Sequence, residues 1–119
     1  MQVKSYKQLV VWQKSMKLTV EVYRLTKVLP ADELYGLVSQ MRRSAVSLPS
    51  NIAEGFQRAG RADQGRFMQI AYASAAELET QLELCRQLHY LNETQTADAD
   101  GLVTEVQRML NTIIQQLKS

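Results

Sequence analysis

Apolar residues recur every three or four positions along most of the chain, which is the spacing of an amphipathic helix. In residues 7–29 they form two rows, so the predicted first helix has an apolar face wider than contact with one neighbouring helix requires. Pro30 ends this helix, because the residue before a proline is displaced from helical geometry. The two rows are Leu9, Trp12, Met16, Val20 and Tyr23, and Val11, Leu18, Val22, Leu25 and Leu29.

The same spacing predicts a second helix over residues 33–57, with Asp32 as its N-cap. The pattern continues across Pro49, which removes a backbone donor and crowds the preceding turn. We therefore predict one kinked helix and not two separate ones. Its inward positions are Leu34, Leu37, Val38, Met41, Ala45, Leu48, Ile52 and Phe56.

A third helix is predicted over residues 63–90, with Asp63 as its cap and a centre rich in alanine. Small side chains let helix backbones approach closely, so we expect a tight crossing with Ala45 and Ala53 of the second helix. The inner positions of the third helix are Phe67, Ile70, Ala71, Ser74, Leu78, Leu82 and Cys85.

The polar stretch 92–100 is interpreted as a loop, and the last helix is predicted over residues 99–117. No run alternates apolar and polar residues in the way a strand requires. The chain is thus predicted to be one all-α domain, residues 1–119, folded as an antiparallel up-down-up-down four-helix bundle. The inward positions of the last helix are Leu102, Val106, Met109, Leu110, Ile113, Ile114 and Leu117.

Charge is unevenly distributed, although the net charge is only +2. Residues 1–66 hold 11 Lys and Arg against 5 Asp and Glu, whereas residues 67–119 hold 3 against 7. This asymmetry indicates either a basic surface for a polyanion or oppositely charged faces that pair between subunits. The lone Cys85 favours a reducing compartment, and no apolar run is long enough for a membrane span, so we expect a cytoplasmic protein.

The segment from Ser47 to Gly55 concentrates capping residues and helix breakers in the middle of a helical pattern. We interpret it as a structural motif in which Ser50 and Asn51 satisfy the backbone groups that Pro49 frees. Gly55, with Ala53, would permit close approach of the third helix. On this interpretation two motif side chains should be buried with polar partners, namely Arg42, Arg43 or a neighbouring subunit. These two side chains are Asn51 and Glu54.

Catalytic and metal-binding patterns are sparse. The paired Glu-x-x-His motifs of a carboxylate metal site are absent, and the single His89 lacks an acid three residues before it. Cys85 and His89 stand four residues apart, so a small hydrolase built on them is one alternative, although no orienting third group is evident. We expect a noncatalytic protein with no metal, no cofactor and no small-molecule substrate.

Basic residues give the main functional hypothesis. If they gather on one face, they form a surface that binds nucleic-acid phosphates without base specificity. Arginine also suits carboxylates on a neighbouring subunit, in which case the protein is a structural or adaptor oligomer that binds a protein partner. The candidate phosphate-binding residues are Lys7, Lys14, Lys17, Arg42, Arg43, Arg58, Arg61 and Arg66.

The run from Gln40 to Gly55, QMRRSAVSLPSNIAEG, resembles the hallmark of a known family. Further matches are LVVWQ at residues 9–13, Leu29-Pro30, and residues 71–82 of the third helix. The family is that of the four-helix bundle proteins first known as products of intervening sequences in bacterial 23S rRNA genes. The likeness covers nearly the whole chain.

What the resemblance implies is a bundle that assembles into a closed ring, typically a homopentamer, with no established enzymatic activity. The chain is also similar to the accessory protein of diversity-generating retroelements, a related basic pentamer that works with nucleic acid and a reverse transcriptase. The expected partners are therefore further copies of the chain and RNA or DNA. A ring agrees with the wide apolar face of the first helix and with the charge asymmetry between the two halves.

Overall fold

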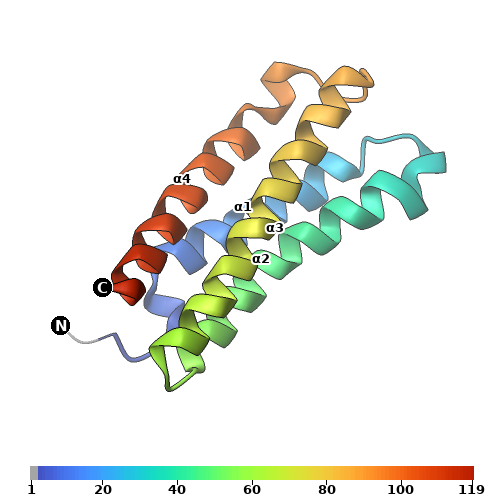
Figure 1. The fold of residues 1–119 in the computed structure, drawn as a ribbon. Helices are drawn as coiled ribbons and strands as arrows, with labels where there is room; N and C mark the ends of the chain where they lie inside the picture. The colour runs from blue at the N-terminus through green and yellow to red at the C-terminus, as the bar shows by residue number, and fades with distance from the viewer. Residues whose placement is uncertain (1–2) are drawn as a thin grey trace.

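The computed structural model describes residues 3–119, and within that range every regular element is helical (Figure 1). The all-α class is thus confirmed. No helix in the described part is long and apolar enough to cross a bilayer. The four long helices are α1 (Val10–Thr26), α2 (Ser39–Gln57), α3 (Arg61–Gln87) and α4 (Glu93–Lys118).

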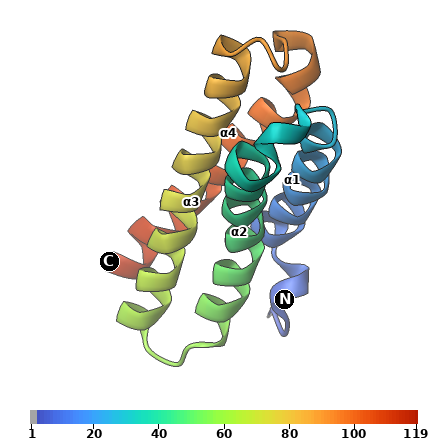
Figure 2. The same cartoon turned by 90° about the vertical axis from the view of Figure 1, so that its right-hand side faces the viewer.

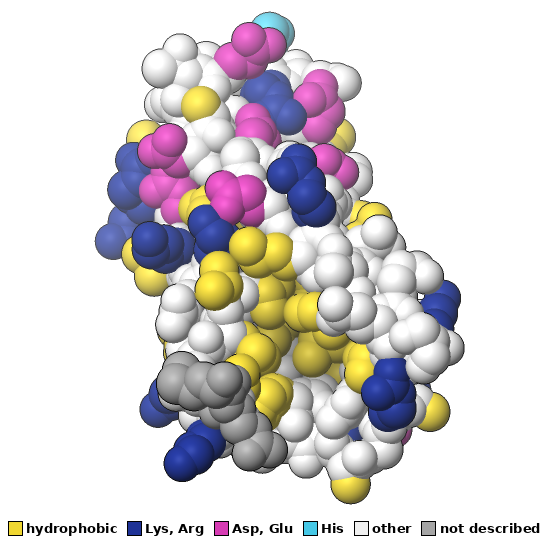
Figure 3. Space-filling view, turned by 90° about the vertical axis from the view of Figure 1, so that its left-hand side faces the viewer, with side chains coloured by type: hydrophobic (Ala, Val, Ile, Leu, Met, Phe, Trp, Pro, Cys, Tyr) yellow, Lys and Arg dark blue, Asp and Glu magenta, His cyan; other side chains and the backbone are white. Residues whose placement is uncertain are grey.

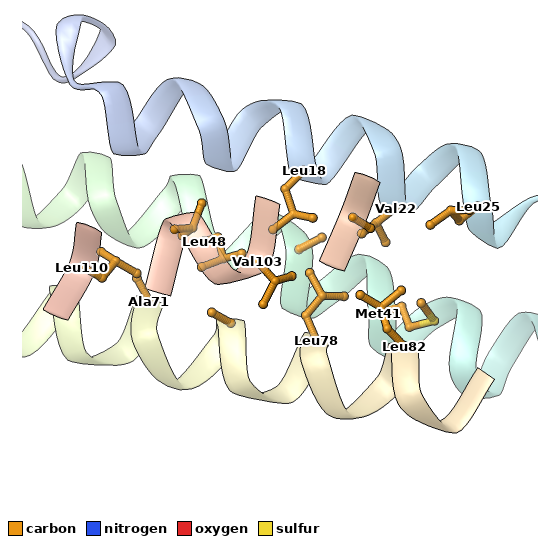
Figure 4. Close-up of a cluster of buried hydrophobic side chains, with 14 of the residues drawn as sticks. Leu18, Val22, Leu25, Met41, Leu48, Ala71, Leu78, Leu82, Val103 and Leu110 are labelled. Atoms are coloured by element: carbon orange, nitrogen blue, oxygen red, sulfur yellow. The ribbon is translucent and has the colours of Figure 1, made fainter. Parts of the chain in front are cut away.

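One core lies between the four helices (Figure 2). α2 packs on α1 and α3, and α4 packs on α3 and α1, so each helix has two neighbours. Each contributes leucines that are fully removed from solvent, such as Leu18, Leu48, Leu78 and Leu110 (Figure 4). This packing places the functional residues on the outer faces and at the two ends of the bundle.

The first helix buries only one of its two predicted apolar rows. The chain enters through a 3₁₀ turn, Tyr6–Gln8, that is capped by Ser5, and regular α-helix begins at Val10. The row from Val11 to Leu29 is buried. The other row is half-buried at Leu9 and Trp12, and it is exposed at Met16, Val20 and Tyr23.

The connection from α1 to α2 is more irregular than the predicted start at residue 33. A 3₁₀ turn, Ala31–Glu33, is followed by a π-helical turn, Leu34–Val38, and regular helix begins at Ser39. Glu33, and not Asp32, provides the cap, because its carboxylate accepts a hydrogen bond from the Leu37 amide at 3.2 Å. Leu34 lies at the surface and not in the predicted core.

Pro49 does not divide α2, so the prediction of one helix is confirmed. A proline leaves the carbonyl four residues earlier without its usual amide donor. That carbonyl, Ala45 O, lies 2.9 Å from Thr19 Oγ1 of α1, which also lies 2.8 Å from Ser15 O. The single hydroxyl proton of Thr19 is shared between the two carbonyls, and nothing local to Pro49 in the sequence indicates this partner.

α2 and α3 cross closely, as the small residues predicted. A Cβ atom added to the buried Gly55 would lie 3.0 Å from Phe67 Cβ and 3.3 Å from the Gln64 carbonyl. Ser47 and Ser74 share a hydrogen bond of 2.7 Å between their hydroxyls. Ala53 does not take part in this crossing, because it lies on the side of α2 that faces α1.

Two predicted helix starts are wrong. α4 begins at Glu93, so the stretch 92–100 is not a loop, and Asn92 and Gln95 form a reciprocal capping box with bonds of 2.8 and 2.9 Å. α3 begins at Arg61 after Gly60, which leaves Asp63 inside the first turn and not at the cap. α3 ends at Gln87 and not near residue 90.

Candidate functional site

The motif from Ser47 to Gly55 is tied into the bundle through Asn51. This side chain is half-buried, and its amide nitrogen donates to the Ser47 carbonyl at 2.8 Å and to the Ser47 hydroxyl at 2.9 Å. Through Ser47 the motif reaches Ser74 on α3. Asn51 therefore has polar partners, but both belong to Ser47 of its own helix and not to Arg42 or Arg43.

Glu54 is exposed, so the prediction that it is buried is wrong. It lies six residues after the buried Leu48, and at roughly 100° per residue it points about 120° away from the core. Its carboxylate accepts a hydrogen bond from Arg58 at 2.9 Å. Ser50 is also exposed, so the structural part of the motif is Ser47, Pro49, Asn51 and Gly55.

Cys85 and His89 do not meet. Cys85 is fully buried with its thiol 3.6 Å from the Met41 sulfur, and burial raises the pKa of the thiol. His89 lies beyond the end of α3 with a left-handed φ of 62°, and it is exposed. The geometry assumed for a hydrolase is therefore absent. Within residues 3–119 no three His, Cys, Asp or Glu side chains gather as metal ligands would.

The eight predicted phosphate-binding residues do not share one face. Lys14 pairs with Glu105 of α4 at 2.5 Å, and Lys17 lines a groove together with Glu21 and Asp98. These carboxylates would repel phosphate. Lys14 and Lys17 therefore lie beside carboxylates and do not form a basic surface.

Two further arginines lie on the outer face of α1 and α2. The Arg42 guanidinium stands 4.5 Å above the Tyr23 ring, and its Nε donates to the Thr26 hydroxyl at 2.9 Å. Arg43 is exposed beside it. Sixteen residues of helix separate Arg42 from Arg58, which amounts to about 24 Å. These arginines are thus remote from those around the second loop.

The remaining arginines gather where α2 ends and α3 begins. The guanidinium groups of Arg58 and Arg66 stand 4.7 and 4.6 Å from the centre of the Phe67 ring. Arg66 pairs with Asp63 at 3.1 Å. The aromatic ring therefore positions two guanidinium groups at the surface of the loop.

Arg61 connects this loop to the end of α4. Its guanidinium donates to the Gln116 carbonyl at 2.5 Å and to the Leu117 carbonyl at 3.3 Å. Lys118 lines a groove together with Arg61 and Arg66, so α4 adds a cation that sequence reasoning missed. We call this set the arginine end. It comprises Arg58, Arg61, Arg66 and Lys118.

Acidic residues concentrate toward the opposite end of a molecule that is 44 Å long (Figure 3). There Arg86 of α3 donates to Asp100 at 2.8 Å and to the Thr96 hydroxyl at 2.9 Å. It also donates to Glu83 at 2.8 Å, which lowers the pKa of that carboxyl. The charge asymmetry of the sequence thus becomes, in part, a difference between the two ends.

Residues 7–112 match the model of one protein family, the 23S rRNA-intervening sequence proteins. The chain belongs to this family. The resemblance found in the run from Gln40 to Gly55 is thus confirmed. No curated protein matches the chain.

A solved structure of another family member has the same fold. It is a protein of unknown function from the S23 ribosomal protein family of Bacteroides thetaiotaomicron, 33% identical in sequence, with a TM-score of 0.81. The similarity covers 88% of this chain and 98% of that one. The same four-helix fold is thus found in a relative of this chain.

One apolar hollow remains on the face that α1 and α4 share (Figure 3). Leu9 and Val10 line it from the start of α1, and Met109 and Ile113 line it from α4. Arg108 is the one charged residue among its described lining residues. In this family member the hollow is separate from the arginine end.

Proposed function

We propose that this 23S rRNA-intervening sequence protein is a noncatalytic, cytoplasmic homo-oligomer that binds RNA through phosphate contacts at the arginine end. A pentameric ring is the assembly that the family resemblance implies. We also propose an up-down-up-down order of the helices. The short connections at residues 58–60 and 88–92, and the packing of each helix on the preceding one, support that order.

The main observation in support of this proposal is that cations from three helices converge at the arginine end. Arg58 and Arg66 are held at the surface by Phe67 in readiness for an anion, so little side-chain entropy is lost on binding. The side chains of their present partners, Glu54 and Asp63, are 52 and 45% exposed, and ion pairs open to water contribute little to stability. A phosphate can therefore replace these carboxylates at small cost. The proposed contact set is narrower than the eight residues predicted from the sequence.

Titration of a labelled structured RNA at low and moderate salt tests the proposal. The double variant Arg58→Gln/Arg66→Gln should bind more weakly, and the slope of log affinity against log salt should fall by about 1 to 2 units, since each phosphate contact contributes roughly 0.7 to 0.9. The matched control is Lys14→Gln/Lys17→Gln, which removes the same charge from the α1–α4 side. Absence of binding at low salt, or equal losses in both variants, contradicts the proposal.

A second candidate function is a structural or adaptor oligomer with no nucleic-acid role. The exposed apolar row of α1, which continues onto α2, favours it because contiguous apolar surface marks protein interaction sites. On this alternative, Arg58→Gln/Arg66→Gln lowers the mass of the oligomer and not its affinity for RNA. A role beside a reverse transcriptase stays a prediction of the resemblance and forms no part of this proposal.

A further inference from the structure

One outer face of the bundle combines exposed apolar side chains with arginines. Along α1 and α2 two grooves share Val46, so they form one continuous surface. Val20 extends this surface, because it lies four residues after Met16, which lines one groove, and is 68% exposed. We call it the basic apolar face. Its members are Met16, Val20, Tyr23, Tyr35, Arg42, Arg43 and Val46.

This face is costly to leave in water. Tyr35, in the π-helical turn before α2, is 93% exposed, and about two thirds of Val20 is exposed. Large contiguous apolar patches are uncommon on monomers and mark surfaces that another molecule covers. Among the described residues that line the two grooves none is acidic, so the partner should be apolar and negatively charged.

α3 carries a second exposed apolar surface of the opposite charge. Ile70, Leu84 and Leu88 are 40, 43 and 49% exposed, and the exposed Glu77 lies on the same side of the helix at a spacing of seven residues from Ile70 and Leu84. The neighbouring Ser74 contacts α2, so this side of α3 borders α2. We call Ile70, Glu77, Leu84 and Leu88 the acidic apolar stripe.

Charge decides which surfaces can pair. Two basic apolar faces brought together would place Arg42 and Arg43 of one copy against the same arginines of another, which is repulsive. The hollow between α1 and α4 carries Arg108 and would meet the same repulsion. The stripe on α3 instead offers the carboxylate of Glu77, on the same side of the helix as Ile70 and Leu84.

We infer that the basic apolar face of one copy packs against the acidic apolar stripe of the next copy. This inference rests on the homo-oligomer of the proposed function and adds the two surfaces that join. Because the two surfaces differ, a copy that uses one of them in a contact keeps the other free for a further neighbour. Such head-to-tail contacts close into a ring when the rotation between copies permits it.

Two variants, each of which disrupts one of the two surfaces, test the proposed contact between copies. Val20→Glu places a carboxylate on the basic apolar face, where it would meet Glu77 of the neighbour, and Leu84→Lys places a cation on the stripe, where it would meet Arg42 and Arg43. Native mass spectrometry should show that each variant is monomeric where the wild type is assembled. An equimolar mixture should form a one-to-one dimer, because one intact surface of each kind remains.

Val10→Glu is the matched control, since Val10 is an exposed α1 valine that lines the α1–α4 hollow and not the basic apolar face. It should assemble like the wild type, and circular dichroism should show equal helix content in all variants. A charge exchange adds a second measurement: Arg43→Glu and Glu77→Arg should each weaken assembly at least about tenfold, and the double variant should recover it.

Three outcomes overturn the inference. If Val20→Glu is monomeric while Leu84→Lys still assembles, the basic apolar face does not pair with the stripe. If both variants assemble like the wild type, the contact between copies lies elsewhere and only this inference fails. If the wild type itself is monomeric, the oligomer of the proposed function fails as well. RNA binding by Arg58 and Arg66 is measured separately and is decided by none of these results.

Discussion

α1 carries two apolar rows, and the other helices of the chain cover only one of them. Val11, Leu18 and Val22 face the core and are buried, whereas Met16 and Val20 lie at the surface although their spacing is equally regular. Helical periodicity identifies apolar positions, but it does not distinguish positions buried within one chain from positions available to a second molecule. The inner row therefore determines folding, and the outer row is available for assembly.

Truncation of one residue in each row gives the largest expected difference. Leu18→Ala opens a cavity in a fully buried position and should lower the free energy of unfolding by about 3 kcal/mol. Val20→Ala removes methyl groups that already contact water, so stability should change by less than about 0.5 kcal/mol. Chemical denaturation of monomeric material measures both. Equal losses in the two variants would contradict the distinction between the rows.

Two glycine substitutions compare a closely packed position in α2 with an open position in α4. Gly55→Ala forces a methyl group against Phe67 and the Gln64 carbonyl, and should destabilise by about 1 to 3 kcal/mol. Gly101 lies in α4 with no atom within 4 Å of an added Cβ. Gly101→Ala should therefore stabilise by up to about 1 kcal/mol through helix propensity. Thermal unfolding reports both signs, and stabilisation by Gly55→Ala would contradict the close crossing.

Thr19 lies between the two rows and supplies the donor that Pro49 removes. Thr19→Val keeps the shape but leaves Ala45 O unsatisfied, so we expect a loss of about 1 kcal/mol. Thr104 is an exposed threonine whose hydroxyl bonds only within its own helix, and Thr104→Val should change stability by less than about 0.5 kcal/mol. Urea unfolding of the two variants compares them directly.

The polar side of α1 should give the smallest effect. Lys14, through its hydrogen bond and charge, holds the pKa of Glu105 below its ordinary value of 4.5. Because the folded-state pKa is the lower one, this pair stabilises the fold above that value, and the contribution is lost as pH falls through the folded-state pKa. Glu105→Gln should be slightly less stable than wild type at neutral pH, and this difference should shrink as the pH is lowered below 4.5. A gap that persists in acid would show that the pair is not its source.

The sequence predicts the four helices and the close crossing at Gly55 because both depend on local spacing and side-chain size. The start of α4 was also predictable, since Asn92 followed three residues later by Gln95 is a capping signature that the polar composition obscured. Contacts between residues far apart in the sequence could not be predicted in this way. The bond from Thr19 to Ala45 depends on how two helices are rotated against each other, which no local pattern specifies.

The composition of the arginine end likewise depends on contacts that local sequence patterns do not specify. Arg58, Arg61 and Arg66 are close in sequence, so their proximity was expected, but Lys118 joins them only because α4 packs along α3. Lys14 and Lys17 were assigned to a phosphate surface by their spacing on one helix. The acidic residues of α4 that oppose them, Asp98 and Glu105, lie far away in the sequence.

The single tryptophan of the chain belongs to the outer apolar row of α1. Trp12 is half-buried, its ring is 5.4 Å from that of Tyr6, and it lines the groove between α1 and α2. Indole emission shifts toward the blue and brightens when water is removed from the ring. The protein therefore contains an intrinsic fluorophore beside its outer face, and if copies assemble through that face as proposed, dilution should red-shift the spectrum without any label.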